Sequence, residues 1–118
     1  MPEINDIEAV DGYESKTGDF TVGDKSYVIQ FNTGRIKLYE NSNRPLMAVF
    51  AMNGGTFSIS ELETIAAYGL REEGGNYVNP KQGAKMAEKL IEENGYFALY
   101  EAVVNVLGRD CNFLFKGM

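Results

Sequence analysis

The chain has 118 residues, near the commonest size of a single domain, and a chain of this length buries roughly two-thirds of its unfolded surface when it folds. A composition of 44% hydrophobic and 24% charged residues, with only three prolines, excludes wholesale disorder and indicates one globular domain. A net charge of −6 argues against unspecific binding to nucleic acid.

The first 19 residues carry most of this charge. They contain six acidic residues and one basic residue, a net −5, whereas residues 20–118 contain eleven acids and ten bases. We therefore predict an acidic, flexible N-terminal arm over residues 1–19 and a single globular domain over residues 20–118. The N-terminus lacks the basic start and apolar core of a signal peptide, and no run of roughly 20 apolar residues occurs, so we expect a cytoplasmic protein without a membrane span.

Residues 20–31 show the alternation of apolar and polar side chains that is typical of strands, interrupted by Gly23-Asp24. This pattern predicts a β-hairpin with a two-residue loop of type I′ or II′, in which Gly23 supplies the positive φ. A short helix should follow, beginning at Thr33 and ending before residues 41–44. Pro45 suits the first turn of a second helix, which Asn53, Gly54 and Gly55 should end.

Ser60 and Glu63 match the S-x-x-E capping signature and predict a third helix that extends to Gly69. Residues 71–79 read as a loop that ends at Asn79, the expected N-cap of a fourth helix over Pro80–Glu93. The inward face of the fourth helix should consist of Ala84, Ala87, Leu90 and Ile91. A fifth helix should follow and end at Gly108, and its inward face should consist of Phe97, Tyr100, Val103, Val104 and Leu107.

Residues 111–115 alternate weakly and favour an added C-terminal strand. The expected fold is therefore α+β, with an N-terminal β-hairpin or small antiparallel sheet packed against about five short helices.

The sequence offers little for catalysis. It contains no histidine, the usual base of nucleophilic sites, and one cysteine, Cys111, whose apolar neighbours indicate a buried thiol. The glutamate pairs lie beside glycines and read as solvated surface, and neither the calcium-loop spacing nor a phosphate-binding loop occurs. We expect no catalytic residues, no cofactor and no metal site.

Aromatic side chains are more informative. The chain has seven tyrosines and seven phenylalanines, several of them crowded into its last quarter. Some of these should form the core and others a surface for a partner. The residues that we assign to partner contact are Tyr96, Leu99, Tyr100, Val103, Phe113 and Phe115.

The order of these features resembles the tail assembly chaperones of long-tailed, siphovirus-type phages and the related tail proteins of gene transfer agents. The resemblance covers about residues 18–108. It is carried by six segments: Gly-Asp-Lys-Ser-Tyr-Val-Ile-Gln-Phe at 23–31, Thr-Gly-Arg-Ile-Lys-Leu-Tyr-Glu at 33–40, Arg-Pro-Leu-Met-Ala-Val-Phe at 44–50, Phe-Ser-Ile-Ser-Glu-Leu at 57–62, Ala-Lys-Met-Ala-Glu-Lys-Leu-Ile at 84–91 and Gly-Tyr-Phe-Ala-Leu-Tyr-Glu-Ala at 95–102.

The resemblance implies a protein without enzymatic activity in the bacterial cytoplasm. Such a protein coats the tape measure protein and keeps it soluble until tail tube protein subunits displace it. It also implies self-association and a short form beside a frameshifted longer form, and this chain would be the short form. Two alternatives stay open: a structural tail subunit, and an acidic protein-binding inhibitor or regulator that uses residues 1–19.

Overall fold

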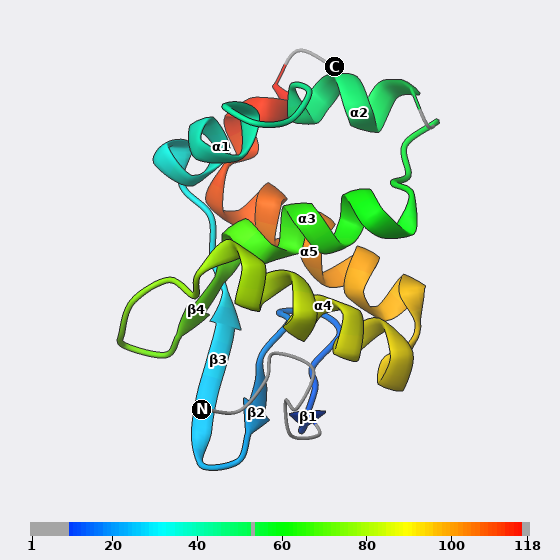
Figure 1. The fold of residues 1–118 in the computed structure, drawn as a ribbon. Helices are drawn as coiled ribbons and strands as arrows, with labels where there is room; N and C mark the ends of the chain where they lie inside the picture. The colour runs from blue at the N-terminus through cyan, green and yellow to red at the C-terminus, as the bar shows by residue number, and fades with distance from the viewer. Residues whose placement is uncertain (1–9, 53, 117–118) are drawn as a thin grey trace.

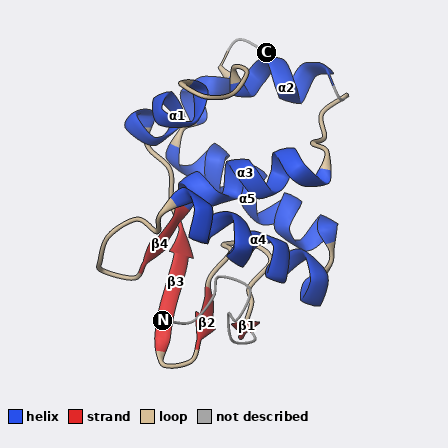
Figure 2. Ribbon diagram, in the orientation of Figure 1, coloured by secondary structure: helices blue, strands red, loops and turns tan. Residues whose placement is uncertain are grey.

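The computed structural model describes residues 10–52 and 54–116. Over these residues the fold is α+β, as expected, and the helices gather on one side of a small antiparallel sheet (Figures 1 and 2). The elements in chain order are β1 (Val10–Asp11), β2 (Phe20–Val22), β3 (Lys25–Ile29), α1 (Thr33–Glu40), α2 (Leu46–Met52), α3 (Ile59–Gly69), β4 (Leu70–Glu72), α4 (Pro80–Asn94), α5 (Tyr96–Asp110) and the 3₁₀ helix η2 (Asn112–Phe115).

The sheet has the order β1-β2-β3-β4, and each neighbouring pair is antiparallel. Val22 pairs with Lys25, which confirms the predicted hairpin with its two-residue loop. Gly23 has φ +63°, and no non-glycine residue in the described part of the chain has positive φ. Asp24 therefore has negative φ, which leaves the type II′ loop of the two expected types.

Part of the predicted N-terminal arm belongs to the domain. Val10 is buried and pairs with Val22, and the Tyr13 hydroxyl donates a 2.9 Å hydrogen bond to the carbonyl of Ala98 in α5. The charge pattern of this stretch hid these contacts, because its acidic residues Asp11, Glu14 and Asp19 are exposed to solvent. The predicted boundary after residue 19 is thus wrong for residues 10–19, and residues 1–9 lie outside the described part.

Two helices begin at residues other than those that we predicted as caps. The Asn32 side chain, not Thr33, accepts a hydrogen bond from the Arg35 amide at the start of α1. At the start of α3 the capping box is formed by Ser58 and Glu61, not by Ser60 and Glu63. Both pairs satisfy the motif, and buried Phe57 just before the cap favours the earlier one, as in a hydrophobic staple.

Three predictions about the chain after α3 and around the end of α5 are also wrong. Residues 71 and 72, predicted as part of a loop, belong to strand β4 (Leu70–Glu72), which pairs with β3. The strand forms although Arg71 and Glu72 are polar, because buried Leu70 pairs with Ile29. Gly108 does not end α5, which continues to Asp110. Residues 112–115 form η2 instead of a strand, because the Cys111 amide bonds the Leu107 carbonyl and continues the helical turn.

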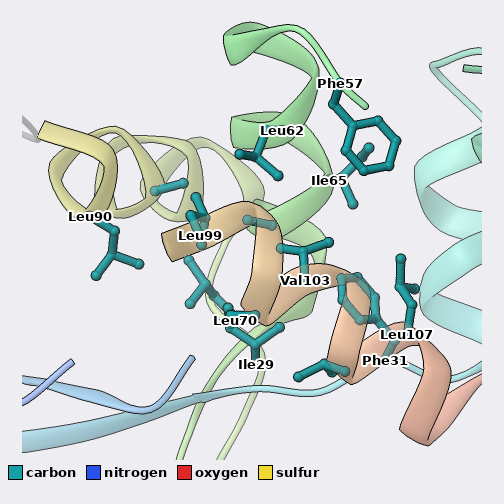
Figure 3. Packing of buried hydrophobic residues seen from close by; sticks show 14 of the residues in the cluster. Ile29, Phe31, Phe57, Leu62, Ile65, Leu70, Leu90, Leu99, Val103 and Leu107 are labelled. Carbon is teal, nitrogen blue, oxygen red and sulfur yellow. The ribbon is translucent and has the colours of Figure 1, made fainter. Parts of the chain in front are cut away.

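The core lies where α3, α4 and α5 meet the end of β3 (Figure 3). The α4 face that turns inward consists of Gly83, Met86, Ala87 and Leu90, so Ala84 and Ile91, which we expected inside, are only half-buried. The helix starts with Pro80 after the Asn79 cap, as predicted. Its inward face is rotated because Gly83 lies directly against Ala67 of α3.

This close approach yields a first prediction. A Cβ added at Gly83 would lie 2.9 Å from the Ala67 carbonyl oxygen and 3.0 Å from its Cα, so the backbones of α3 and α4 would have to separate. Alanine gains up to about 1 kcal/mol of helix propensity, but such overpacking costs about 1–3 kcal/mol. We expect Gly83→Ala to lower the free energy of unfolding, measured by urea titration.

Gly108 is the matched control for Gly83. It lies inside α5 at an exposed position, and an added Cβ there would meet no atom within 4 Å. Gly108→Ala should therefore raise the free energy of unfolding by about 0.5–1 kcal/mol. Equal changes in the two variants would show that α3 and α4 do not approach as closely as described.

Candidate partner-binding surface

Helix α5 is rotated relative to the predicted orientation: Val103 and Leu107 are buried as expected, whereas Tyr100 and Val104 are half-buried. Its buried residues are Leu99, Ala102, Val103, Val106 and Leu107, whereas the Phe97 side chain is 74% exposed. Both sets of residues have helical spacing, but Phe97 shares its stripe with Glu101 and Asn105, which are also exposed. Leu99 and Val103 have no exposed surface, so of the residues assigned to partner contact these two pack in the core instead.

The first turns of α5 carry three aromatic rings that contact one another. Tyr96 stacks on Tyr100 with ring centroids 5.9 Å apart, and Phe97 meets the Tyr96 ring edge-to-face at 5.1 Å. Tyr96 and Tyr100 are half-buried. Aromatic pairs in these geometries each stabilise a structure by about 0.5–1.5 kcal/mol beyond the area that they bury.

The aromatic contacts continue across the molecule to the other end of the predicted surface. Tyr100 lies 6.0 Å from Phe57, Phe57 lies 5.5 Å from Phe50 in α2, and Phe50 lies 6.4 Å from Phe115 in η2, measured between ring centroids. We call this row of rings the aromatic row; its members are Phe97, Tyr96, Tyr100, Phe57, Phe50 and Phe115. The row joins three of the predicted contact residues: Tyr96, Tyr100 and Phe115.

The hydroxyl groups of the two tyrosines bind the segment that precedes α3. The Tyr96 hydroxyl donates to the Phe57 carbonyl at 2.5 Å and accepts from the Phe57 amide at 3.2 Å. The Tyr100 hydroxyl donates to the Gly55 carbonyl. Both polar ends are thus bound to backbone, which fixes the rings in place at the junction of α3 and α5.

Two large apolar side chains remain exposed at this junction. Ile59, the first residue of α3, is 57% exposed. It lies two residues after Phe57, whose backbone binds the Tyr96 hydroxyl. Phe97 follows Tyr96 directly. We call Ile59, Phe97 and the half-buried Tyr96 the apolar junction. The sequence reasoning missed Ile59 and Phe97 because it placed the α3 cap two residues late and turned Phe97 inward.

The opposite end of the aromatic row is also partly open to solvent. Phe113 in η2 is 48% exposed, and its neighbour Phe115 is half-buried against Phe50. Two of the residues that we assigned to partner contact therefore lie on the η2 side, far along α5 from Tyr96. Whether a partner covers either end stays a prediction.

A hollow of about 730 Å³ lies beside the loop between α1 and α2. Its lining contains one carboxylate, Glu61, which already accepts a hydrogen bond from the Ser58 amide, and no histidine or cysteine. The residues around it are Tyr39, Asn41, Ser42, Asn43, Arg44, Val49 and Glu61. This set provides no nucleophile with an adjacent base.

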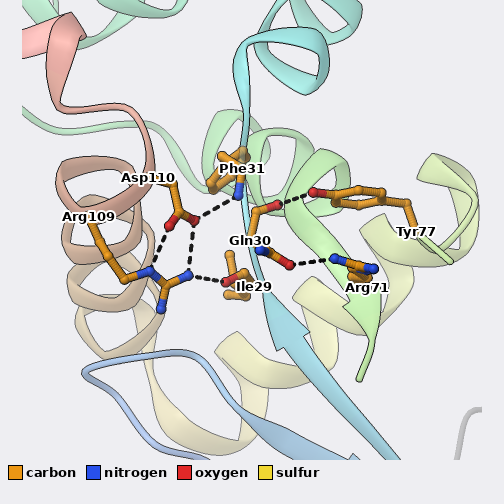
Figure 4. A network of polar contacts seen from close by, with 7 residues as sticks. All are labelled: Ile29, Gln30, Phe31, Arg71, Tyr77, Arg109 and Asp110. Atoms are coloured by element: carbon orange, nitrogen blue, oxygen red, sulfur yellow. Dashed lines mark hydrogen bonds and ion pairs between the residues drawn. The ribbon is translucent and has the colours of Figure 1, made fainter. Parts of the chain in front are cut away.

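The other concentration of polar side chains surrounds the end of β3 (Figure 4). The Gln30 side chain accepts a hydrogen bond from Arg71 at 2.7 Å, and the Gln30 carbonyl accepts one from the Tyr77 hydroxyl at 2.9 Å. On the other side of the strand, Asp110 accepts from the Phe31 amide at 3.0 Å. These bonds tie the chain that leaves β3 to β4, the following loop and α5, so we interpret the network as structural.

Within residues 10–52 and 54–116, no group of three or more His, Cys, Asp or Glu side chains is placed to hold a metal ion. In the same residues no helix combines the length and apolar character needed to cross a bilayer. Comparisons with protein-family models, with curated proteins and with solved structures found no match to this chain.

Proposed function

We propose that this chain is a tail assembly chaperone of the siphovirus type, which binds the tape measure protein and keeps it soluble until tail tube subunits replace it. The sequence resemblance over residues 18–108 suggests this class. The observation that carries the binding role is the apolar junction, where Phe97 and Ile59 are 74% and 57% exposed on a well-packed helical body. Exposed aromatic and aliphatic side chains supported by bound rings are typical of protein-binding sites.

The apolar junction suits a chaperone because its support is rigid while its outer side chains are free. Tyr96 is held by two hydrogen bonds to Phe57. When a partner binds at Phe97, the surrounding rings therefore lose little side-chain entropy. A long helical protein presents repeated apolar stripes, and burying one of them requires no polar pocket.

Co-expression with the tape measure protein of the same genome tests the proposal. We expect the soluble fraction of the tape measure protein to rise when this chain is present, and to fall again with Phe97→Ala. Leu38→Ala is the control, because it removes an exposed apolar side chain from α1, which contributes no residue to the aromatic row. A tape measure protein that is equally soluble and assembles equally well without this chain contradicts the proposal.

Mass spectrometry of purified particles separates the proposal from a structural tail subunit. A chaperone should be absent from finished particles, whereas a subunit should be present in many copies. For the inhibitor alternative, residues 1–19 would have to act as a free acidic arm. Half of that segment is packed in the domain through Val10 and Tyr13, which weakens this alternative.

A further inference from the structure

The nearly neutral body has a strongly uneven charge distribution. The segments 57–69 and 85–101, which form α3 and the adjoining ends of α4 and α5, contain six glutamates and two lysines, a net −4. The rest of residues 20–118 contains five acids and eight bases, a net +3. The apolar junction thus belongs to the acidic part of the domain.

Three of these glutamates, one on α3 and two on α4, lie close enough to act on one another. Burial raises the pKa of Glu63, the carboxylates of Glu88 and Glu92 raise it further, and Lys85 lowers it. Glu63 also lies one helical turn after Ile59 on α3, so it shares that face. Among the described residues none of these three carboxylates forms an ion pair. We call Glu63, Glu88 and Glu92 the acidic group.

The neighbouring acids are bound within the protein. Glu61 accepts the Ser58 amide in the capping box, and Glu93 contacts Lys89 and the Val10 amide. The acidic group therefore differs from these carboxylates: its members repel one another, and Glu63 lies one helical turn from the exposed Ile59. A cationic partner would relieve this repulsion.

The backbone around the apolar junction limits the conformation of a partner. The junction is built from the first residues of α3 and α5, whereas the sheet edges are formed by β1 and β4. A partner cannot extend the sheet here, so it must satisfy its own backbone hydrogen bonds while it buries apolar side chains. An α-helix meets both requirements.

We infer that the apolar junction and the acidic group together bind one cationic amphipathic helix, whose apolar stripe covers Phe97 and Ile59 and whose Lys or Arg residues face Glu63 and Glu92. This inference rests on the proposed function, and it specifies which segments of a long helical partner are recognised. Apolar contact supplies affinity, and the charges select cationic helices over anionic ones.

Two labelled model peptides of about 18 residues test the inference, one of Leu and Lys and one of Leu and Glu with the same apolar stripe. Fluorescence anisotropy should detect binding of the Leu/Lys peptide and much weaker binding of the Leu/Glu peptide. Phe97→Ala should weaken binding of the Leu/Lys peptide about tenfold or more. The isosteric double variant Glu63→Gln/Glu92→Gln should weaken it about threefold to tenfold and reduce its dependence on salt.

Asp24→Asn/Glu73→Gln is the matched control, because it removes two exposed charges on the side of the hairpin and β4. It should leave binding of the peptide nearly unchanged. Equal binding of both peptides, or an equal loss in the control double variant, would overturn the inference.

If Glu63→Gln/Glu92→Gln still solubilises the tape measure protein fully, the inference fails and the proposed function stands. If the Leu/Lys peptide binds as expected but the tape measure protein gains no solubility, the proposed function fails instead.

Discussion

Leu99→Ala should lower the free energy of unfolding by about 2–5 kcal/mol, because it removes a fully buried side chain and leaves a cavity between α5 and its neighbours. Phe97→Ala, two residues earlier on the same helix, should change it by no more than about 0.5 kcal/mol, because that side chain is 74% exposed. Urea titration of both variants measures the difference.

This pair decides which face of α5 is available to a partner. If Phe97 faced the core, as its spacing with Tyr100 and Val104 first suggested, the order of the two effects would be reversed. In that case Phe97→Ala would lose binding in the co-expression assay because it misfolds, and its urea titration would show a lowered free energy of unfolding. A stable Phe97→Ala variant with weakened binding separates recognition from folding.

The second large effect is expected at Asp110, which connects α5 to the chain after β3. Its carboxylate is 15% exposed, accepts the Phe31 amide and pairs with Arg109 at 2.7 Å. Asp110→Ala leaves the Phe31 amide without this partner and should lower the free energy of unfolding by about 1–3 kcal/mol at neutral pH. Asp110→Asn, which retains an acceptor, should cost less.

The contribution of Asp110 should also depend on pH. Burial by itself raises the pKa of this carboxyl, but hydrogen bonds from Arg109 and from the Phe31 amide, together with the Arg109 charge, hold it below its usual value. A carboxyl whose pKa is lowered by folding stabilises the protein above its unfolded pKa of about 3.9 and loses that contribution as the pH falls through the folded pKa. The difference between wild type and Asp110→Asn should therefore shrink below about pH 4.

Urea titrations of both proteins between neutral and acidic pH measure this change. Asp24→Asn is a suitable control, because Asp24 lies exposed in the hairpin loop. A difference between wild type and Asp110→Asn that stays constant down to the lowest pH would contradict the assigned role of the carboxylate.

Local signals predicted several elements correctly. The hairpin loop at Gly23-Asp24 was predictable because its geometry depends on these two residues alone. The start of α4 was predictable because the Asn79 cap and the fixed φ of Pro80 both act within one helical turn. Where two local solutions exist, the sequence was ambiguous. Ser58 and Ser60 each have a glutamate three residues later, and only the burial of Phe57 distinguishes them.

Composition and local patterns were enough to predict the α+β class, the hairpin and the order of the helices, and they showed how few catalytic groups the chain carries. The orientation of α5 needed the fold, because Phe97 has core spacing with Tyr100 and Val104 and surface spacing with Glu101 and Asn105. The same holds for strand β4, which exists because β3 offers it a partner, and for the apolar junction, which forms where Tyr96 binds Phe57 across 39 residues of sequence. Such contacts depend on distant parts of the chain, and no local pattern encodes them.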